Sequence, residues 1–306
     1  MKNIVSKNPP EPLSSDPFSW SKRQRKGRWG PIARELHGSY AFVERNLNLI
    51  KRYWAWEIVL FVYSVVNALS ITFIGKASEE ITGQAMSPEA INIFILYLMV
   101  GALVWHYLSL VFDVVSEAIQ WERWEGTIEY TFMAPISRLA HLFGQAIFAI
   151  CYGTLHTILI LLFVGLFFDL NLSQANFLTM GLVLVTGSLS FVGLGLMAAI
   201  LPLLWPEKGV QMTNVIKALV LLVSGVYYPI SVLPEWLQPL SAISPATYML
   251  VGMRAALLQG ATPAAVLGTA LGPLGLTALV TVPFGLIFFG WAEVYAKRTG
   301  ILKRSG

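Results

Sequence analysis

Charged residues and cysteines are scarce in this chain, and each scarcity excludes a class of protein or site. Only 12% of the residues are charged, whereas a soluble domain carries about 25%. The single cysteine, Cys151, lies in an apolar run, so the sequence predicts neither a disulfide framework nor a cysteine metal site. The chain also lacks a Gly-x-x-x-x-Gly-Lys-Ser/Thr phosphate loop, so the sequence predicts no nucleotide site of that type.

Long apolar stretches dominate instead. The chain is 56% hydrophobic, with a mean hydropathy of +0.64, and about 20 apolar residues suffice for one helix to cross a bilayer. Seven stretches can be counted, at 57–75, 90–114, 139–168, 175–204, 212–230, 236–258 and 263–291. The sequence therefore predicts an all-α polytopic membrane protein.

The basic residues decide how many of these stretches cross. Residues 1–56 hold eleven of the 21 lysines and arginines, and the tail after Glu293 holds four more. Basic segments stay on the cytoplasmic side, so both termini are expected there and the number of crossings must be even. The stretch 236–258 is the weakest, because prolines interrupt it and Arg254 lies within it. We predict six transmembrane helices in a domain at 57–296, with a re-entrant element at about 230–260.

The segments outside this domain are basic. Residues 1–37 are expected to form a flexible cytoplasmic arm, which either sets the orientation of the chain or contacts anionic headgroups. Residues 38–56 show an apolar side with three- and four-residue spacing, which predicts an amphipathic interfacial helix. Residues 297–306 form a basic cytoplasmic tail. The apolar side of the interfacial helix consists of Tyr40, Val43, Leu47, Ile50 and Trp54.

A dense polar block at 120–135 separates two stretches that carry no charge, 90–112 and 139–168. Because a charged helix is costly in hydrocarbon, the block must protrude at the cytoplasmic face. Glu122, Glu125 and Glu129 have the spacing of one helical face, beside an aromatic face. The spacing indicates a helix that offers an acidic surface to a partner; a solvated loop between spans is the alternative.

The region after 212–230 is interrupted by prolines at five-residue intervals, Pro229, Pro234 and Pro239. Proline removes a backbone donor and disfavours helix at the preceding residue. Ser244 and Pro245 then have the pattern of a helix start, and Gly260 that of a helix stop. The pattern predicts two short helices folded back on the outer side. A plain external loop is the alternative, although 236–253 carries no charge.

Two motifs resemble those of type-2 ATP-binding-cassette exporter permeases. The first is Glu122-Arg-Trp-Glu-Gly-Thr-Ile-Glu followed by Met133-Ala-Pro-Ile-Ser-Arg. The second is Ser224-Gly-Val-Tyr-Tyr-Pro-Ile, then Leu233-Pro-Glu-Trp-Leu, then Ser244-Pro-Ala-Thr-Tyr through Arg254. The resemblance covers about residues 38–295. It implies six spans, an interfacial helix before the first, a cytoplasmic coupling helix between the second and third, and re-entrant helices between the fifth and sixth.

The resemblance also implies partners. Two permeases pair, either two copies of this chain or this chain and a homologue, and two separate ABC ATPase subunits dock beneath them. ATP and Mg²⁺ then bind the ATPase, while this chain is not an enzyme and binds no cofactor or nucleic acid. The implied ATPase-coupling residues are Trp121, Glu122, Trp124, Glu125, Gly126, Thr127, Glu129 and Pro135. The residues assigned to the external gate or re-entrant element are Gly225, Tyr227, Tyr228, Pro229, Pro234, Trp236, Pro245 and Arg254.

Other polar residues have structural explanations at this stage. His106, His141 and His156 lack the spacing of a metal site. Asp113 and Glu117 are candidates for function, or are simply wetted by cytosol, and Lys217 is expected to be structural. The glycines of 193–198 match a dinucleotide fingerprint, but they lie in an apolar span, which favours close helix packing. Tyr227 and Tyr228 are either gate or interface-belt residues.

The sequence thus predicts the transmembrane subunit of an ATP-driven exporter in the inner (plasma) membrane. An amphipathic, lipid-like or drug-like substrate is expected, and a lipid-linked glycan is the alternative. An ion-coupled transporter would show repeated halves and paired charges at mid-membrane. A membrane-embedded enzyme would show clustered His, Asp or Ser groups. Neither pattern is evident in the sequence.

Labelling of engineered cysteines tests the number of spans. In a variant lacking Cys151, cysteines introduced by Gln238→Cys and Ala261→Cys should both react with an impermeant thiol reagent added outside the cell. Both positions then lie on the outer side of a re-entrant element. Labelling of the two positions from opposite faces would show that 239–260 crosses the membrane and would contradict the six-span topology.

Overall fold

The computed structural model describes residues 30–83, 85, 87–134, 136–168 and 173–301, and these residues form helices and connecting loops with no strand. Five helical segments are long and apolar enough to cross a membrane: Trp54–Lys76, Pro88–Ser116, Arg138–Gly165, Phe177–Leu204 and Leu267–Thr299. The prediction of a multi-pass α-helical membrane protein is confirmed at this level. The sixth expected span is a shorter helix, α11 (Gly209–Val223), and the six-span arrangement stays a prediction.

The N-terminal helix α2 (Pro31–Arg52) begins before the expected boundary at residue 38 and ends before Trp54. The chain bends at Tyr53, so Trp54, which was expected on the apolar side of the amphipathic helix, is instead the first residue of α3 (Trp54–Lys76). Proline at the first helical position of α2 explains the earlier start, because its missing N–H is not needed there. The apolar residues Tyr40 and Leu47 are exposed, and the opposite side of α2 packs on α8 (Arg138–Gly165).

Helix α5 (Pro88–Ser116) lies at the centre of the bundle and packs against α3, α8 and α9 (Phe177–Ala198). Its residues Leu108 and Val111 are fully buried. Local signals explain where the helices start: Ser87 accepts a hydrogen bond from the Ala90 amide, and Ser137 accepts one from the Ala140 amide. These are the N-cap bonds that satisfy donors at the first turn of a helix.

Helix α9 and the last helix, α14 (Gly272–Thr299), make the most extensive helix pair. A Cβ at Gly193 would lie 2.3 Å from Oγ1 of Thr281, so only glycine permits this approach. Ser190 adds a hydrogen bond of 2.8 Å to the carbonyl of Leu274. The interpretation of Gly193 as a helix-packing residue is therefore confirmed.

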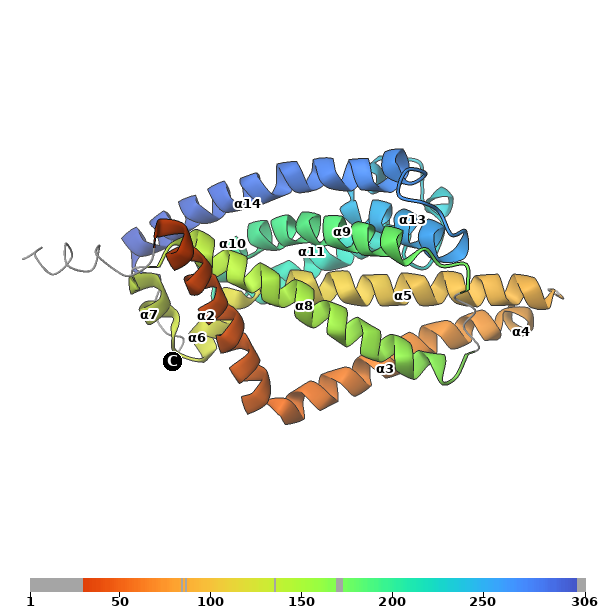
Figure 1. Ribbon diagram of the computed structural model, residues 1–306, viewed down its shortest axis with the longest axis horizontal. Helices are drawn as coiled ribbons and strands as arrows, with labels where there is room; N and C mark the ends of the chain where they lie inside the picture. The colour runs from red at the N-terminus through yellow and green to blue at the C-terminus, as the bar shows by residue number, and fades with distance from the viewer. Residues whose placement is uncertain (1–29, 84, 86, 135, 169–172, 302–306) are drawn as a thin grey trace, which may run out of the picture.

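The shorter elements lie at the ends of the bundle (Figure 1). At one end, α6 (Ala118–Trp124) and α7 (Ile128–Met133) lie near the end of α14 and the start of α2. At the other lie α4 (Ser78–Thr82), α13 (Pro245–Leu258) and the start of α14. The remaining elements are α10 (Ile200–Leu204), the 3-10 turn Ile230–Val232, α12 (Gln238–Ile243) and the π-helical turn Leu267–Leu271. The two expected short helices, α12 and α13, are present; their re-entrant placement stays a prediction.

Candidate functional site

Residues 118–133, the coupling segment, form two short helices and not the single helix that the spacing of the glutamates suggested. Helix α6 ends at Trp124, the chain turns through Glu125–Thr127, and α7 begins at Ile128. The turn requires Gly126, whose φ of +71° lies in the left-handed region that favours glycine. Because the helix is broken there, Glu122, Glu125 and Glu129 do not share one face.

Glu122 is buried and does not face a partner. Its side chain is 1% exposed, and Oε1 accepts a hydrogen bond of 2.8 Å from Nη1 of Arg45 on α2. The Nε2 atom of His141 on α8 lies 3.1 Å from the same oxygen. Burial by itself raises the pKa of Glu122, but the contacts with His141 and Arg45 outweigh burial and hold this pKa below its ordinary value. Glu122 thus fastens the coupling segment to two other helices.

Glu125 is also held by the N-terminal helix. It accepts hydrogen bonds of 2.9 Å from Nη1 of Arg52 and 2.7 Å from the hydroxyl of Tyr53. Arg45 reaches past Glu122 to donate a 2.7 Å bond to Oγ1 of Thr127. The polar side of α2 therefore covers the acidic side of the coupling segment, which explains why sequence spacing placed these glutamates wrongly on the outer surface.

Two arginines connect the coupling segment and the start of α8 to α10 and α14. The buried Arg123 donates a 2.8 Å bond from Nη2 to the carbonyl of Leu203 in α10. Arg138 donates a 3.0 Å bond to Glu293 of α14, and Lys297 forms a second ion pair with Glu293 at 2.7 Å. The coupling segment and its neighbours are thus linked by charged contacts to α2, α8, α10 and α14.

The outward surface of the coupling segment is mainly apolar. Tyr130 is 78% and Met133 is 83% exposed, beside the exposed carboxylate of Glu129. Trp121 and Trp124 are exposed on α6, and their rings contact each other at a centroid distance of 5.3 Å. Pro135, the last residue of the expected coupling set, lies outside the described residues.

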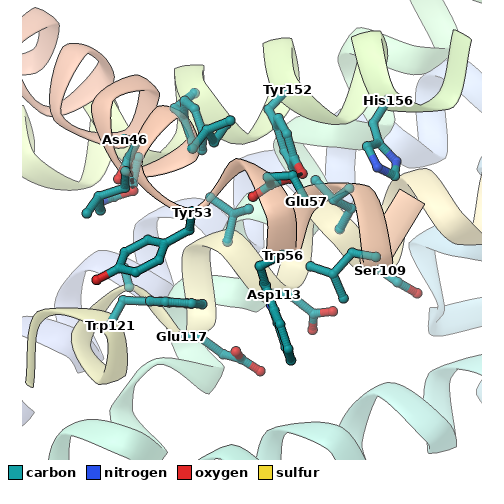
Figure 2. Close-up of a pocket in the computed structure, with 18 of the residues that line it drawn as sticks. Asn46, Tyr53, Trp56, Glu57, Ser109, Asp113, Glu117, Trp121, Tyr152 and His156 are labelled. Carbon is teal, nitrogen blue, oxygen red and sulfur yellow. Dashed lines mark hydrogen bonds between the residues drawn. The ribbon is translucent and has the colours of Figure 1, made fainter. Parts of the chain in front are cut away.

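A cavity of about 500 Å³ opens between α2, α3, α5, α6 and α8, next to the coupling segment. Figure 2 shows Glu57, Asp113, Glu117, Tyr152 and His156 around it, contributed by α3, the end of α5 and α8. The sequence singled out Asp113 and Glu117 but missed Glu57, which carried no recognisable motif. The remaining lining is mostly aromatic and aliphatic.

The carboxylates around the cavity differ in their partners. Asp113 forms an ion pair of 2.7 Å with Lys217 of α11. Lys217 therefore joins α11 to α5. Glu57 accepts a hydrogen bond from the hydroxyl of Tyr152. Glu117 follows α5; burial, and then the charge of Asp113, raise its pKa to about 7.

Two of the histidines meet although they lie 50 residues apart in the sequence. Nε2 of His106 and Nδ1 of His156 are 2.9 Å apart, and the rings stack at 5.0 Å. The described residues contain no group of three His, Cys, Asp or Glu that could hold a metal ion. The two histidines therefore share one hydrogen bond inside the bundle.

The family of the chain follows from its comparison with known proteins. The model of the ABC-2 type transporter family matches residues 39–258, which is more than half of the chain. The chain belongs to this family. No curated protein matches the chain. Members of the family are transporter permeases, are generally not enzymes themselves, and typically work with an ABC ATPase.

The far end of the permease contains the residues expected at the external gate. Arg254 of α13 lies with its Cζ 3.6 Å from the centroid of the Tyr97 ring and donates bonds of 3.1 Å and 2.6 Å to the carbonyls of Gly225 and Val226. Gly225, with φ +68°, makes the turn after α11. Arg254 therefore joins this turn to α13 and α5.

The other expected gate residues surround that turn. The hydroxyl of Tyr228 donates a 2.6 Å bond to the carbonyl of Leu222, whereas Tyr227 packs against the core. Pro245 is buried at the first position of α13. Pro229, Pro234 and Trp236 are exposed. The structure brings these residues to one end of the permease, and their role as a gate stays a prediction.

Removal of Arg45 should destabilise the permease far more than removal of Arg52. Arg45→Met leaves the buried Glu122 without its arginine, at a cost of about 3 kcal/mol, whereas the exposed pair of Arg52 is worth at most about 1 kcal/mol. The thermal unfolding midpoint of each purified variant in mild detergent measures the difference.

A double variant controls for the lost packing of the arginine. Arg45→Met with Glu122→Gln should recover part of the stability, because the buried charge that lost its arginine is gone. Equal midpoints for Arg45→Met and Arg52→Met would contradict the role of Arg45 as the partner of a buried carboxylate.

Proposed function

We propose that this chain is the membrane-spanning subunit of an ATP-driven exporter, with both termini in the cytoplasm and the bundle in the inner (plasma) membrane. Two permeases, of this chain or of this chain and a homologue, form the translocation path. Each of two separate ATPase subunits binds ATP and Mg²⁺ and docks on one coupling segment. Family membership and the placement of the coupling segment support this proposal.

The sixth span is formed by α11 and the chain that follows it. Fifteen helical residues extend about 22 Å, whereas the hydrocarbon core measures about 30 Å. Irregular backbone can complete the crossing only where protein surrounds it. Ser224, Gly225 and Val226, directly after α11, are buried against the bundle, which satisfies this condition.

The single observation that carries the docking proposal is the contrast between the two sides of the coupling segment. Its inner side is joined by Glu122 and Glu125 to α2 and α8, whereas Glu129, Tyr130 and Met133 project outward. Exposed apolar groups with a charged neighbour are typical of a protein contact. Arg123 binds the carbonyl of Leu203 in α10, and Arg138 pairs with Glu293 of α14. A movement of the outward surface is therefore transmitted to the spans through these contacts.

At the opposite end, Tyr227, Tyr228, Pro229 and Pro234 form the external gate in this proposal. Arg254 ties the turn beneath them to α13, so a shift of α13 relative to α5 would move the gate. The aromatic and aliphatic lining of the cavity favours an amphipathic, lipid-like or drug-like substrate. A volume of about 500 Å³ is small for a long lipid-linked glycan.

Substitution of the outward surface should abolish ATPase docking. In Tyr130→Ala with Met133→Ala, loss of two large exposed contacts should reduce co-purification of the ATPase by at least about tenfold, since hot-spot residues contribute about 2 kcal/mol or more each. Permease-stimulated ATP hydrolysis should fall in parallel.

Ile81→Ala is the matched control, because Ile81 is also a largely exposed apolar residue and belongs to α4 at the far end of the bundle. It should leave docking unchanged. Normal co-purification and ATP hydrolysis in the Tyr130 and Met133 variant would place the ATPase contact elsewhere.

A further inference from the structure

We propose that the cavity between α2, α3, α5 and α8 binds an alkylammonium amphiphile, a molecule with one protonated amine on an apolar chain. As a statement about the transported substrate class, this inference rests on the proposed function above. As a statement about binding, it concerns this chain alone. Four features of the cavity support it: its excess of carboxylates, its unpartnered buried polar atoms, its aromatic lining and its position.

The cavity carries more negative than positive groups. Four carboxylates line it, Glu57, Asp113, Glu117 and Glu122, and two basic side chains are in contact with them, Arg45 and Lys217. Arg45 is paired with Glu122 and Lys217 with Asp113. Within the described part of the chain, Glu57 and Glu117 have no lysine or arginine nitrogen within 4.0 Å. A carboxylate in a partly enclosed site is stabilised by a cation, so the ligand is expected to supply one.

Two lining side chains carry a buried polar atom without a hydrogen-bond partner among the described residues. Oε2 of Glu122 is one, although Oε1 of the same carboxylate is paired with Arg45. Nε2 of His156 is the other, and it is an acceptor in the tautomer whose Nδ1 donates to Nε2 of His106. Both residues are more than nine-tenths buried and both line the cavity. A buried polar atom left unpaired is costly, and an ammonium group brings three N–H donors.

The rest of the lining suits a cation with an apolar chain. Its aromatic residues can contact an ammonium group through their ring faces. Its aliphatic residues offer apolar surface to a chain. The aromatic members are Tyr53, Trp56, Tyr63, Trp121, Phe148 and Tyr152. The aliphatic members include Leu49, Ile50, Leu60, Leu110 and Val114.

Size and position complete the argument. Pockets for drug-sized ligands measure about 300–1,000 Å³, and this one measures about 500 Å³. It lies where α2, the expected interfacial helix, meets the first span, so an amphiphile in the adjacent leaflet would have its head at the height of the carboxylates. An anionic amphiphile would meet excess negative charge there and is disfavoured.

Equilibrium dialysis with radiolabelled dodecylamine tests the proposal. The alkylamine is protonated at pH 7, as lysine is. Permease reconstituted in nanodiscs of zwitterionic lipid should bind it saturably above empty nanodiscs. Dodecyl sulfate, which has the same chain and an anionic head, should neither bind in this way nor displace dodecylamine.

Variants assign the binding to the two uncompensated carboxylates. Glu57→Gln with Glu117→Gln should weaken dodecylamine binding by about tenfold or more, because charge-assisted contacts are lost. Glu89→Gln, an exposed carboxylate at the start of α5, should have no effect. Glutamine preserves the shape and can still accept the bond from Tyr152; monodisperse elution on size exclusion confirms that the variants are folded.

Absence of saturable dodecylamine binding would overturn the proposal, as would equal binding by wild type and by the folded double variant. Equal binding of dodecyl sulfate would show a site selective for the chain only and would also overturn it. These measurements need no ATPase. If dodecylamine does not bind while the ATPase still docks and is stimulated, the ligand assignment is wrong and the proposed function is unaffected. If binding succeeds while docking fails, the proposed function falls and the binding site stands.

Discussion

A buried carboxylate must be paired, and at Glu122 this requirement determines how one end of the molecule is built. Arg45 from α2 and His141 from α8 reach the same oxygen of Glu122, so three segments distant in the sequence meet at one charge. Removal of a charge from water costs several kcal/mol unless a partner and hydrogen bonds compensate it. The coupling segment therefore cannot move far without α2 and α8. A signal from an ATPase on its outer side would reach the spans by this route.

The local structure was largely predictable because its signals are local. Apolar length predicted the long helices, and a proline at the first position with a serine before it predicted the start of α13. The boundary between the interfacial helix and the first span was placed at residue 56 and not at the bend at Tyr53, since no proline or glycine marks that bend. The break at Gly126 was missed for a different reason: the spacing of the three glutamates suits a continuous helix, and only the φ of +71° at this glycine reveals the turn.

The site itself was only partly predictable, because its contacts join distant residues. Arg45 and Glu122 are 77 positions apart, Lys217 and Asp113 are 104 apart, and Tyr152 and Glu57 are 95 apart. Charge placement predicted that the polar block at 120–135 protrudes from the membrane, but not that its acidic side faces α2. An amphipathic helix whose polar side covers another polar element has the same sequence pattern as one whose polar side faces water.

Carbodiimide labelling of carboxylates in the purified, folded permease, read by mass spectrometry at each glutamate, tests the central claim most directly. The structure predicts rapid modification of Glu129, comparable with that of the exposed Glu89, and slow modification of Glu122, which is 1% exposed and held by Arg45 and His141. Comparable rates at Glu122 and Glu129 would contradict it. The coupling segment would then be one exposed helix with its acidic face outward, and Glu122 would not join it to α2 and α8.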